Sequence, residues 1–174
     1  MIELYTFGDT IKMRKLWAPW RMDYITREKD KNCIFCRAWQ EKRDETNYVV
    51  FRGKNCLTML NIFPYNNGHL MIAPYRHLSE IENLRNEEIQ ELMTTSQLMV
   101  KLLKKVMKPN GFNIGINLGR AGGAGIVDHL HLHIVPRWEG DTNYMPVISE
   151  TKVISQALKQ TYRQFKEELS QMGF

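Results

Sequence analysis

The sequence contains only three cysteines among its 174 residues. Small secreted scaffolds that depend on disulfides use an even set of cysteines, so the odd number argues against a disulfide framework. Two of the three, Cys33 and Cys36, form a Cys-x-x-Cys pair. In a chain without structural disulfides, such a pair indicates either a metal site or a redox motif.

Long apolar runs are also missing. A membrane-spanning helix requires roughly 20 consecutive apolar residues, and no stretch of this sequence approaches that length. The first residues lack the basic region followed by an apolar region that defines a secretory signal. We therefore expect a cytoplasmic protein without a membrane partner.

The sequence has no block of like charge. Its 24 Lys and Arg exceed its 19 Asp and Glu, which gives a net charge of +5, but the basic residues are scattered among acidic ones. A mild positive excess favours anionic ligands such as nucleotides, whereas the lack of a basic run argues against nucleic acid as a partner. Repeats and linkers are absent as well, so we expect a single domain.

The pattern of apolar residues predicts an α+β fold. A long amphipathic helix is expected over about 86–108, where apolar side chains recur at the helical period, and a second over about 153–169. Short apolar or alternating segments bounded by turn residues indicate strands, and three of them in succession predict an antiparallel meander. The expected strands are 47–52, 56–63, 69–73, 112–118 and 129–135, and the expected short helices are 16–25 and 37–43.

The segment Asp128–Pro136 carries three of the five histidines. In an extended strand, His129, His131 and His133 would project from one face, while the leucines and the isoleucine between them would project from the other. Histidine serves as base, nucleophile or metal ligand near neutral pH. The row therefore indicates chemistry, against the alternative of polar groups that are merely satisfied on a half-exposed sheet.

Two further motifs accompany the histidines. The glycine-rich segment 119–125 precedes them directly, and its backbone N–H groups could form a nest for an anion, although a loose hairpin turn explains the glycines too. The cysteine pair offers two thiolates, and a tetrahedral zinc site needs two more ligands from elsewhere in the chain. A thioredoxin-like redox motif is the alternative, but no suitable strand precedes the pair and no parallel βαβ pattern is present.

The segment His129-Leu-His-Leu-His-Ile-Val135 resembles the signature of the histidine-triad (HIT) family of nucleotidyl hydrolases and transferases. The resemblance covers about residues 33–140, so the N-terminal arm and helix at 1–32 and the extension at 141–174 would flank one HIT domain. The motifs on either side of this domain, at 17–25 and 140–146, resemble those of the bacterial branch that contains diadenosine tetraphosphate phosphorylases. The supporting motifs are Leu60-Asn-Ile-Phe-Pro64, Gly68-His-Leu-Met-Ile-Ala-Pro74, Pro136-Arg-Trp138, Trp17-Ala-Pro-Trp-Arg-Met-Asp-Tyr-Ile25 and Gly140-Asp-Thr-Asn-Tyr-Met-Pro146.

The resemblance implies that His69, His129, His131 and His133 are the catalytic residues, with His129 as the first histidine of the triad. His131 would be the nucleophile that attacks the α-phosphorus, His133 would contact a phosphate or leaving-group oxygen, and His69 would help to orient the triad. Asn61 would bind the ribose. Contacts to phosphate would come from Asn117, Gly123, Gly125, Ile126 and His133.

The resemblance also implies a structural zinc ion held by Cys33, Cys36, His77 and His129, and a homodimer in which two five-stranded antiparallel sheets join. One departure concerns Ile126, which stands where many family members have a hydroxyl that assists the leaving group. This difference argues against a simple mononucleoside phosphoramidase and is compatible with the phosphorylase branch.

The expected function is therefore a nucleotidyltransferase that cleaves dinucleoside polyphosphates through a nucleotidyl-histidine, of the diadenosine tetraphosphate phosphorylase or ATP adenylyltransferase type. One alternative is a hydrolase that releases AMP, with water as acceptor. A second is a nucleotide-binding module without catalysis. A third makes the histidine row itself a catalytic zinc site, because histidines at i and i+2 can share a metal.

Overall fold

The computed structural model describes residues 33–141 and 157–174. They form a five-stranded antiparallel sheet with the order β1-β2-β3-β5-β4, which confirms the expected sheet and the meander at its start. The strands are β1 (Val49–Arg52), β2 (Cys56–Leu60), β3 (Leu70–Pro74), β4 (Gly111–Ile116) and β5 (Leu132–Arg137). The expected helix at 16–25 lies outside the described residues.

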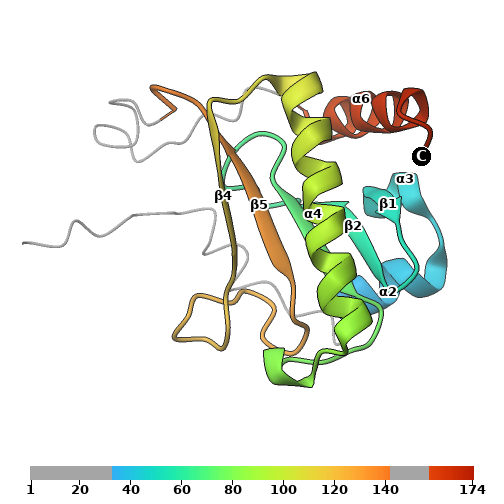
Figure 1. The fold of residues 1–174 in the computed structure, drawn as a ribbon, viewed down its shortest axis with the longest axis vertical. Helices are drawn as coiled ribbons and strands as arrows, with labels where there is room; N and C mark the ends of the chain where they lie inside the picture. The colour runs from blue at the N-terminus through green and yellow to red at the C-terminus, as the bar shows by residue number, and fades with distance from the viewer. Residues whose placement is uncertain (1–32, 142–156) are drawn as a thin grey trace, which may run out of the picture.

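The long helix α4 (Asn86–Met107) covers one face of the sheet (Figure 1). Helix α6 (Leu158–Gln171) lies beside the C-terminal end of α4. Both expected amphipathic helices are thus confirmed over their described parts. Leu103 of α4 and Phe165 of α6 are fully buried with Ile72 of β3 in one core. Because burial of apolar surface is the main stabilising term in folding, this core fixes the sheet against the two helices.

The opposite face of the sheet is covered by the short helix α2 (Ile34–Glu41), which is followed by α3 (Asp44–Asn47). Phe35 and Ala38 of α2 are buried against Leu57 and Met71 in a second core. The helix begins three residues earlier than the expected 37, because Phe35 and Ala38 are both needed on its buried side. Its start at Ile34 places the cysteine pair on its first turn.

The histidine segment differs from the expected strand. β5 begins only at Leu132, which pairs with Ile72 of β3 and Ile116 of β4, so His129 and His131 precede the ladder. Their segment is held by a loop instead, since the Leu130 N–H donates to the Leu78 carbonyl at 2.7 Å. The alternation of side chains nevertheless continues, because Leu130 and Leu132 both lie in the core beneath α4.

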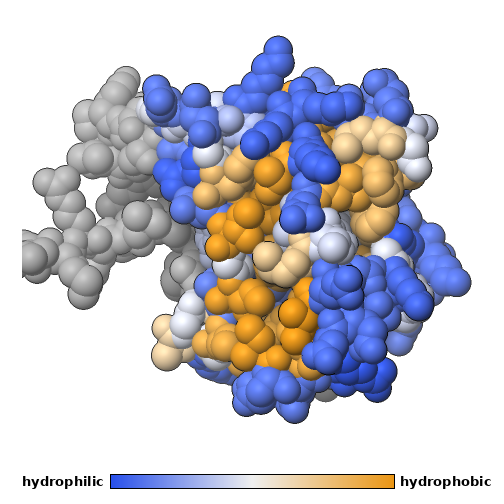
Figure 2. Space-filling view, in the orientation of Figure 1, coloured by the Kyte–Doolittle hydropathy of each residue, from blue (hydrophilic) through white to orange (hydrophobic). Residues whose placement is uncertain are grey.

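The strand β4 is one edge of the sheet within the described residues, and it is poorly covered. Ile114 of β4 is 48% exposed, and on the exposed side of α4 Ile89 and Met93 are 46% and 56% exposed. Figure 2 shows an apolar area on this face of the molecule, between α4 and β4.

Within the described ranges, no helix is long and apolar enough to cross a membrane.

Candidate active site and metal site

The N-terminal turn of α2 presents the two cysteines on one side. Cys33 is the residue before the helix and Cys36 lies three residues later, a spacing that places side chains next to each other on a helix. Phe35, between them, points to the sheet instead, where its ring lies 5.0 Å from the ring of His129. The buried phenylalanine therefore holds the two thiols against the histidine segment.

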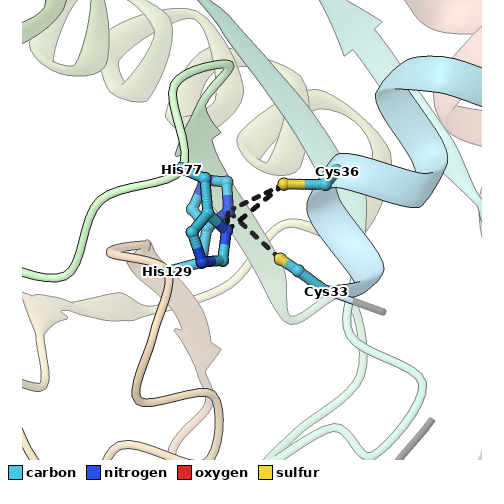
Figure 3. A group of neighbouring side chains, drawn as sticks. All are labelled: Cys33, Cys36, His77 and His129. Atoms are coloured by element: carbon cyan, nitrogen blue, oxygen red, sulfur yellow. Dashed lines mark hydrogen bonds between the residues drawn. The ribbon is translucent and has the colours of Figure 1, made fainter. Parts of the chain in front are cut away.

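The structure brings Cys33, Cys36, His77 and His129 together (Figure 3). The Nδ1 atom of His129 lies 3.1 Å from the sulfur of Cys33, 3.6 Å from that of Cys36 and 3.2 Å from Nδ1 of His77. His77 Nδ1 lies 3.3 Å from the sulfur of Cys36. The edges of a tetrahedral zinc site with two sulfur and two nitrogen ligands are about 3.3–3.7 Å long. The four separations above are close to these lengths, and all four ligand atoms lie within 4.8 Å of one another, so the group could hold a metal ion.

The hydrogen bonds of His129 leave the correct nitrogen available for a metal. Its Nε2 lies 2.9 Å from the Pro74 carbonyl oxygen, and because a carbonyl only accepts, Nε2 carries the proton and Nδ1 the lone pair. Burial, together with His77 and His131, lowers the pKa of His129 to about 4. The ring is therefore neutral at pH 7, as a metal ligand must be.

The thiols of this cluster are also consistent with a cation site. Burial and the neighbouring Cys33 raise the pKa of the Cys36 thiol to about 11. Two thiolates side by side repel each other, and a bound cation removes this penalty because metals displace the thiol protons. The chain's own residues thus fit a divalent metal with sulfur and nitrogen ligands, and zinc is the common metal for such a set.

His131 lies two residues after His129 of the cysteine–histidine cluster and is only 2% exposed. Its Nδ1 is 2.8 Å from the backbone carbonyl oxygen of His129, so the proton is on Nδ1 and the lone pair is on Nε2. The Phe35 ring packs 5.1 Å from the His131 ring, and burial lowers the pKa of His131. A neutral imidazole in this tautomer is a competent nucleophile through Nε2.

His69 and His133 form a second hydrogen-bonded pair. The backbone N–H of Tyr65 donates to His69 Nδ1 at 3.0 Å, so His69 carries its proton on Nε2. This Nε2–H donates to His133 Nδ1 at 3.0 Å. Burial and the neighbouring His131 lower the pKa of His133 to about 4. A neutral His133 that accepts at Nδ1 must carry its proton on Nε2, and it therefore presents an N–H donor.

The His133 ring also contacts the nucleophile. The ring centroids of His131 and His133 are 4.6 Å apart, with the rings nearly perpendicular. A donor beside a nucleophilic nitrogen is the arrangement that stabilises negative charge developing on an oxygen of the attacked group. The three histidines of the segment thus differ in their contacts: His129 faces the cysteines, His131 is backed by Phe35, and His133 is paired with His69.

The residues predicted to contact the nucleotide make contacts within the protein itself. The Asn61 side-chain oxygen accepts from the Phe63 N–H at 2.9 Å, and its Nδ2 lies 3.3 Å from His69 Nδ1. Asn117 donates from Nδ2 to the Gly123 carbonyl at 3.5 Å. The side chain of Ile126 packs against the core around Phe35. The roles of these residues in nucleotide binding remain predictions.

The glycine-rich segment folds as a tight turn. The N–H groups of Gly123 and Ala124 donate to the carbonyls of Arg120 and Gly119, so two of the amides proposed for an anion nest are already bonded. At Gly122 an added Cβ would collide with the Leu118 carbonyl oxygen, which excludes any side chain there. The hairpin-turn alternative therefore explains at least part of the glycine content, and Gly123 and Gly125 stay candidates for phosphate contacts.

Sequence reasoning missed two residues that shape this site. Phe35 backs both His129 and His131, and Tyr65 fixes the tautomer of His69 while its ring stacks on the His69 ring at 4.9 Å. The apolar residues Ile34 and Phe35 between the two cysteines were a signal that this motif packs against a core. No sequence signal exists for Tyr65, because it acts through its backbone N–H.

Residues 42–140 match the HIT domain. The chain is 42% identical to the AP-4-A phosphorylase of Mycobacterium tuberculosis over 164 residues, which cover 90% of this chain and 84% of that protein. It is 31% identical over 93 residues to the asymmetrical bis(5'-nucleosyl)-tetraphosphatase of Schizosaccharomyces pombe, across 53% of this chain and 50% of that protein.

Solved structures show the same fold. A Zn-bound histidine triad family protein from Mycobacterium smegmatis superposes with a TM-score of 0.66 at 24% identity, over 82% of this chain and 96% of that one. A HIT family member from Bacillus subtilis superposes with a TM-score of 0.57 at 22% identity, over 82% and 94% of the two chains. At these identities the likeness concerns the fold alone. The match to the HIT domain across residues 42–140, together with the histidine segment it contains, shows that this chain belongs to the HIT family.

Proposed function

We propose that this protein is a nucleotidyltransferase that cleaves diadenosine tetraphosphate and related dinucleoside polyphosphates, with His131 as nucleophile. The observation that carries the proposal is the protonation pattern of the buried histidines: His131 has its lone pair on Nε2, and His133, whose ring centroid lies 4.6 Å from that of His131, has an N–H donor. Membership of the HIT family and the 42% identity to an AP-4-A phosphorylase support it.

The reaction divides into two displacements at phosphorus. In the first, the lone pair of His131 Nε2 attacks the α-phosphorus, a P–N bond forms, and the P–O bond to the leaving nucleoside triphosphate breaks. In the second, an oxygen of inorganic phosphate attacks the same phosphorus and the P–N bond breaks, which releases a nucleoside diphosphate. Such covalent catalysis replaces one difficult displacement by two easier ones, and His133 donates to the oxygen on which charge develops.

The acceptor distinguishes the two enzymatic alternatives. Purified protein would be incubated with diadenosine tetraphosphate, with and without inorganic phosphate, and the products would be separated by chromatography. We expect ATP and ADP, formed only with phosphate. Formation of AMP at the same rate without phosphate would contradict phosphorolysis and identify the protein as a hydrolase. Tight nucleotide binding without any turnover would favour a non-catalytic module.

A folded His131→Ala variant tests the nucleophile. We expect no nucleotidyl-enzyme and a loss of cleavage, because the variant lacks the Nε2 lone pair that is proposed to attack the phosphorus. Full turnover by His131→Ala would eliminate the mechanism.

We further propose that the metal is zinc, bound by Cys33, Cys36, His77 and His129. When bound, zinc would neutralise two thiolates and link α2 to the two loops that carry the histidines, as closed four-ligand sites do. The carbonyl of His129 accepts from His131, so a fixed His129 also supports the nucleophile. The free cysteines fit a reducing compartment such as the cytoplasm.

A homodimer is proposed for the same molecule. The edge strand β4 has an unpaired side within the described residues, and apolar side chains are exposed both on it, at Ile114, and on α4, at Met93. Exposed apolar strand edges associate readily with a second chain. Two copies that meet along β4 would join their sheets and cover Ile114.

A further inference from the structure

A hydrogen-bonded cluster at the end of β5 has no role in the mechanism above. Its centre is Asp141, whose side chain is only 10% exposed. Arg137 grips the carboxylate with two nitrogens, at 2.6 Å from Nε to Oδ2 and 2.8 Å from Nη2 to Oδ1. Arg137 also donates to Asn113 of β4 at 2.8 Å. The carboxylate is therefore held rigidly on the paired end of β4 and β5.

Asp141 holds a residue of the turn that leads to His69. Asn66 is 8% exposed, and its Nδ2 donates to Asp141 Oδ2 at 2.8 Å and to the Pro136 carbonyl at 3.1 Å. The backbone carbonyl of Asn66 in turn accepts from the N–H of His69 at 3.2 Å. A chain of contacts thus runs from β5 through Asp141 and Asn66 to the backbone of His69.

The pairing of β3 with β5 does not by itself place His69, although the His69 carbonyl accepts from the Asn61 N–H at 2.9 Å on the side of β2. The ladder between β3 and β5 contains three residue pairs and ends at Leu70 and Ile134, so His69 is the first residue beyond it. Its partner His133 lies inside β5. The hydrogen bond between the His69 and His133 rings is 3.0 Å long, and it forms only if the turn at 64–68 keeps a fixed position relative to β5. The side chain of Asn66 fixes this position through its hydrogen bonds to Asp141 and to the Pro136 carbonyl.

We propose that Asn66 and Asp141 are positioning residues that align His69 with His133 and so keep the His133 proton on Nε2. The inference rests on the proposed function of His133 as a donor in nucleotidyl transfer. Neither residue touches the reacting atoms; both act through His69. Their effect on the reaction therefore cannot exceed the effect of losing the His69–His133 bond itself.

The expected loss of rate is limited to the effect of losing the His69–His133 hydrogen bond. Loss of a neutral hydrogen bond corresponds to about a 2- to 13-fold change. Asn66→Ala, and separately Asp141→Ala, should slow single-turnover formation of the nucleotidyl-enzyme within that range without weakening substrate binding. In a His69→Ala background, neither change should slow the reaction further, because the bond they support is already absent.

Asp44→Asn is the matched control. Arg52 also grips Asp44 with two nitrogens, at 3.0 Å from Nε and 2.7 Å from Nη2 to Oδ1, but this ion pair lies by β1, two strands away from β3. The control variant should lose a comparable ion pair and keep the parent rate. A purely structural role would instead slow all three variants in proportion to their loss of stability.

Nitrogen and proton NMR of the imidazoles provides a readout that does not need turnover. In the parent, His69 should be protonated at Nε2 and His133 at Nε2, and Asn66→Ala should shift His133 toward a mixture of tautomers. If the parent is active and the double variant slows nucleotidyl-enzyme formation by the product of the two single effects, the positioning role is refuted while the proposed function stands. Unchanged tautomers in Asn66→Ala would overturn it even if the parent proved inactive, an outcome that would separately refute the proposed function.

Discussion

The direction of the hydrogen bonds around His69 leads to a quantitative prediction. The Tyr65 N–H donates to Nδ1 of His69, and Nε2–H of His69 donates to Nδ1 of His133. A glutamine at position 69 can reproduce this polarity, because its amide oxygen accepts from Tyr65 and its NH₂ group donates to His133. His69→Gln should therefore preserve the His133 tautomer, whereas His69→Ala removes its support.

The magnitudes follow from the bonds that are lost. One neutral hydrogen bond contributes about 0.5–1.5 kcal/mol, and about 1.4 kcal/mol is tenfold in rate, so His69→Ala should slow nucleotidyl transfer by about 2- to 13-fold. His133→Ala removes the donor to the developing oxyanion itself, which costs about 100- to 1,000-fold. The rate of nucleotidyl transfer by His69→Gln should be close to that of the parent and higher than that of His69→Ala.

The assay is rapid-quench measurement of nucleotidyl-enzyme formation under single-turnover conditions, which isolates the first displacement from product release. Because His69 is fully buried, urea unfolding of each variant must show that the protein is folded at the assay temperature. The reasoning would be refuted if His69→Gln were as slow as His69→Ala. Equal losses in His69→Ala and His133→Ala would show that His69 itself contacts the reacting group.

Three further predictions concern the metal, acid stability and assembly. Cys33→Ser should lower zinc content, measured by metal analysis of the purified protein; full zinc stoichiometry would contradict the proposed site. The folded-state pKa of His133, about 4, lies below its ordinary value near 6.5, so the unfolded state binds the extra proton and stability should fall as pH drops from about 6.5 toward 4. Urea unfolding across this range should show a shallower decline for His133→Asn, and an identical slope would argue against a neutral buried His133. Ile114→Lys should shift the protein from dimer to monomer in size-exclusion chromatography with light scattering, whereas Phe174→Lys, which alters an exposed aromatic at the C-terminal end, should leave the mass unchanged; a monomeric parent would refute the dimer.

Local patterns in the sequence were sufficient for most of the architecture. Helix α4 followed from apolar residues at the helical period, and β1 to β3 followed from short apolar segments separated by turn residues. The start of β5 could not be predicted, because it depends on how far the pairing with its neighbours extends. Strand β4 ends at Ile116, opposite Leu132, and β3 continues to Pro74 but pairs with β5 only as far as Ile72, also opposite Leu132. His129 and His131 therefore lie outside the strand.

The sequence by itself determined which residue types are available: a cysteine pair, five histidines and a glycine-rich turn next to three of them. The resemblance to the HIT family then assigned roles to them. Only the tertiary structure decided which nitrogen carries the proton in His69, His129, His131 and His133. For His129 and His133 the deciding groups are distant in sequence, namely the Pro74 carbonyl and the His69 ring. For His131 and His69 they are the nearby His129 carbonyl and Tyr65 N–H, which face these rings only once the chain has folded.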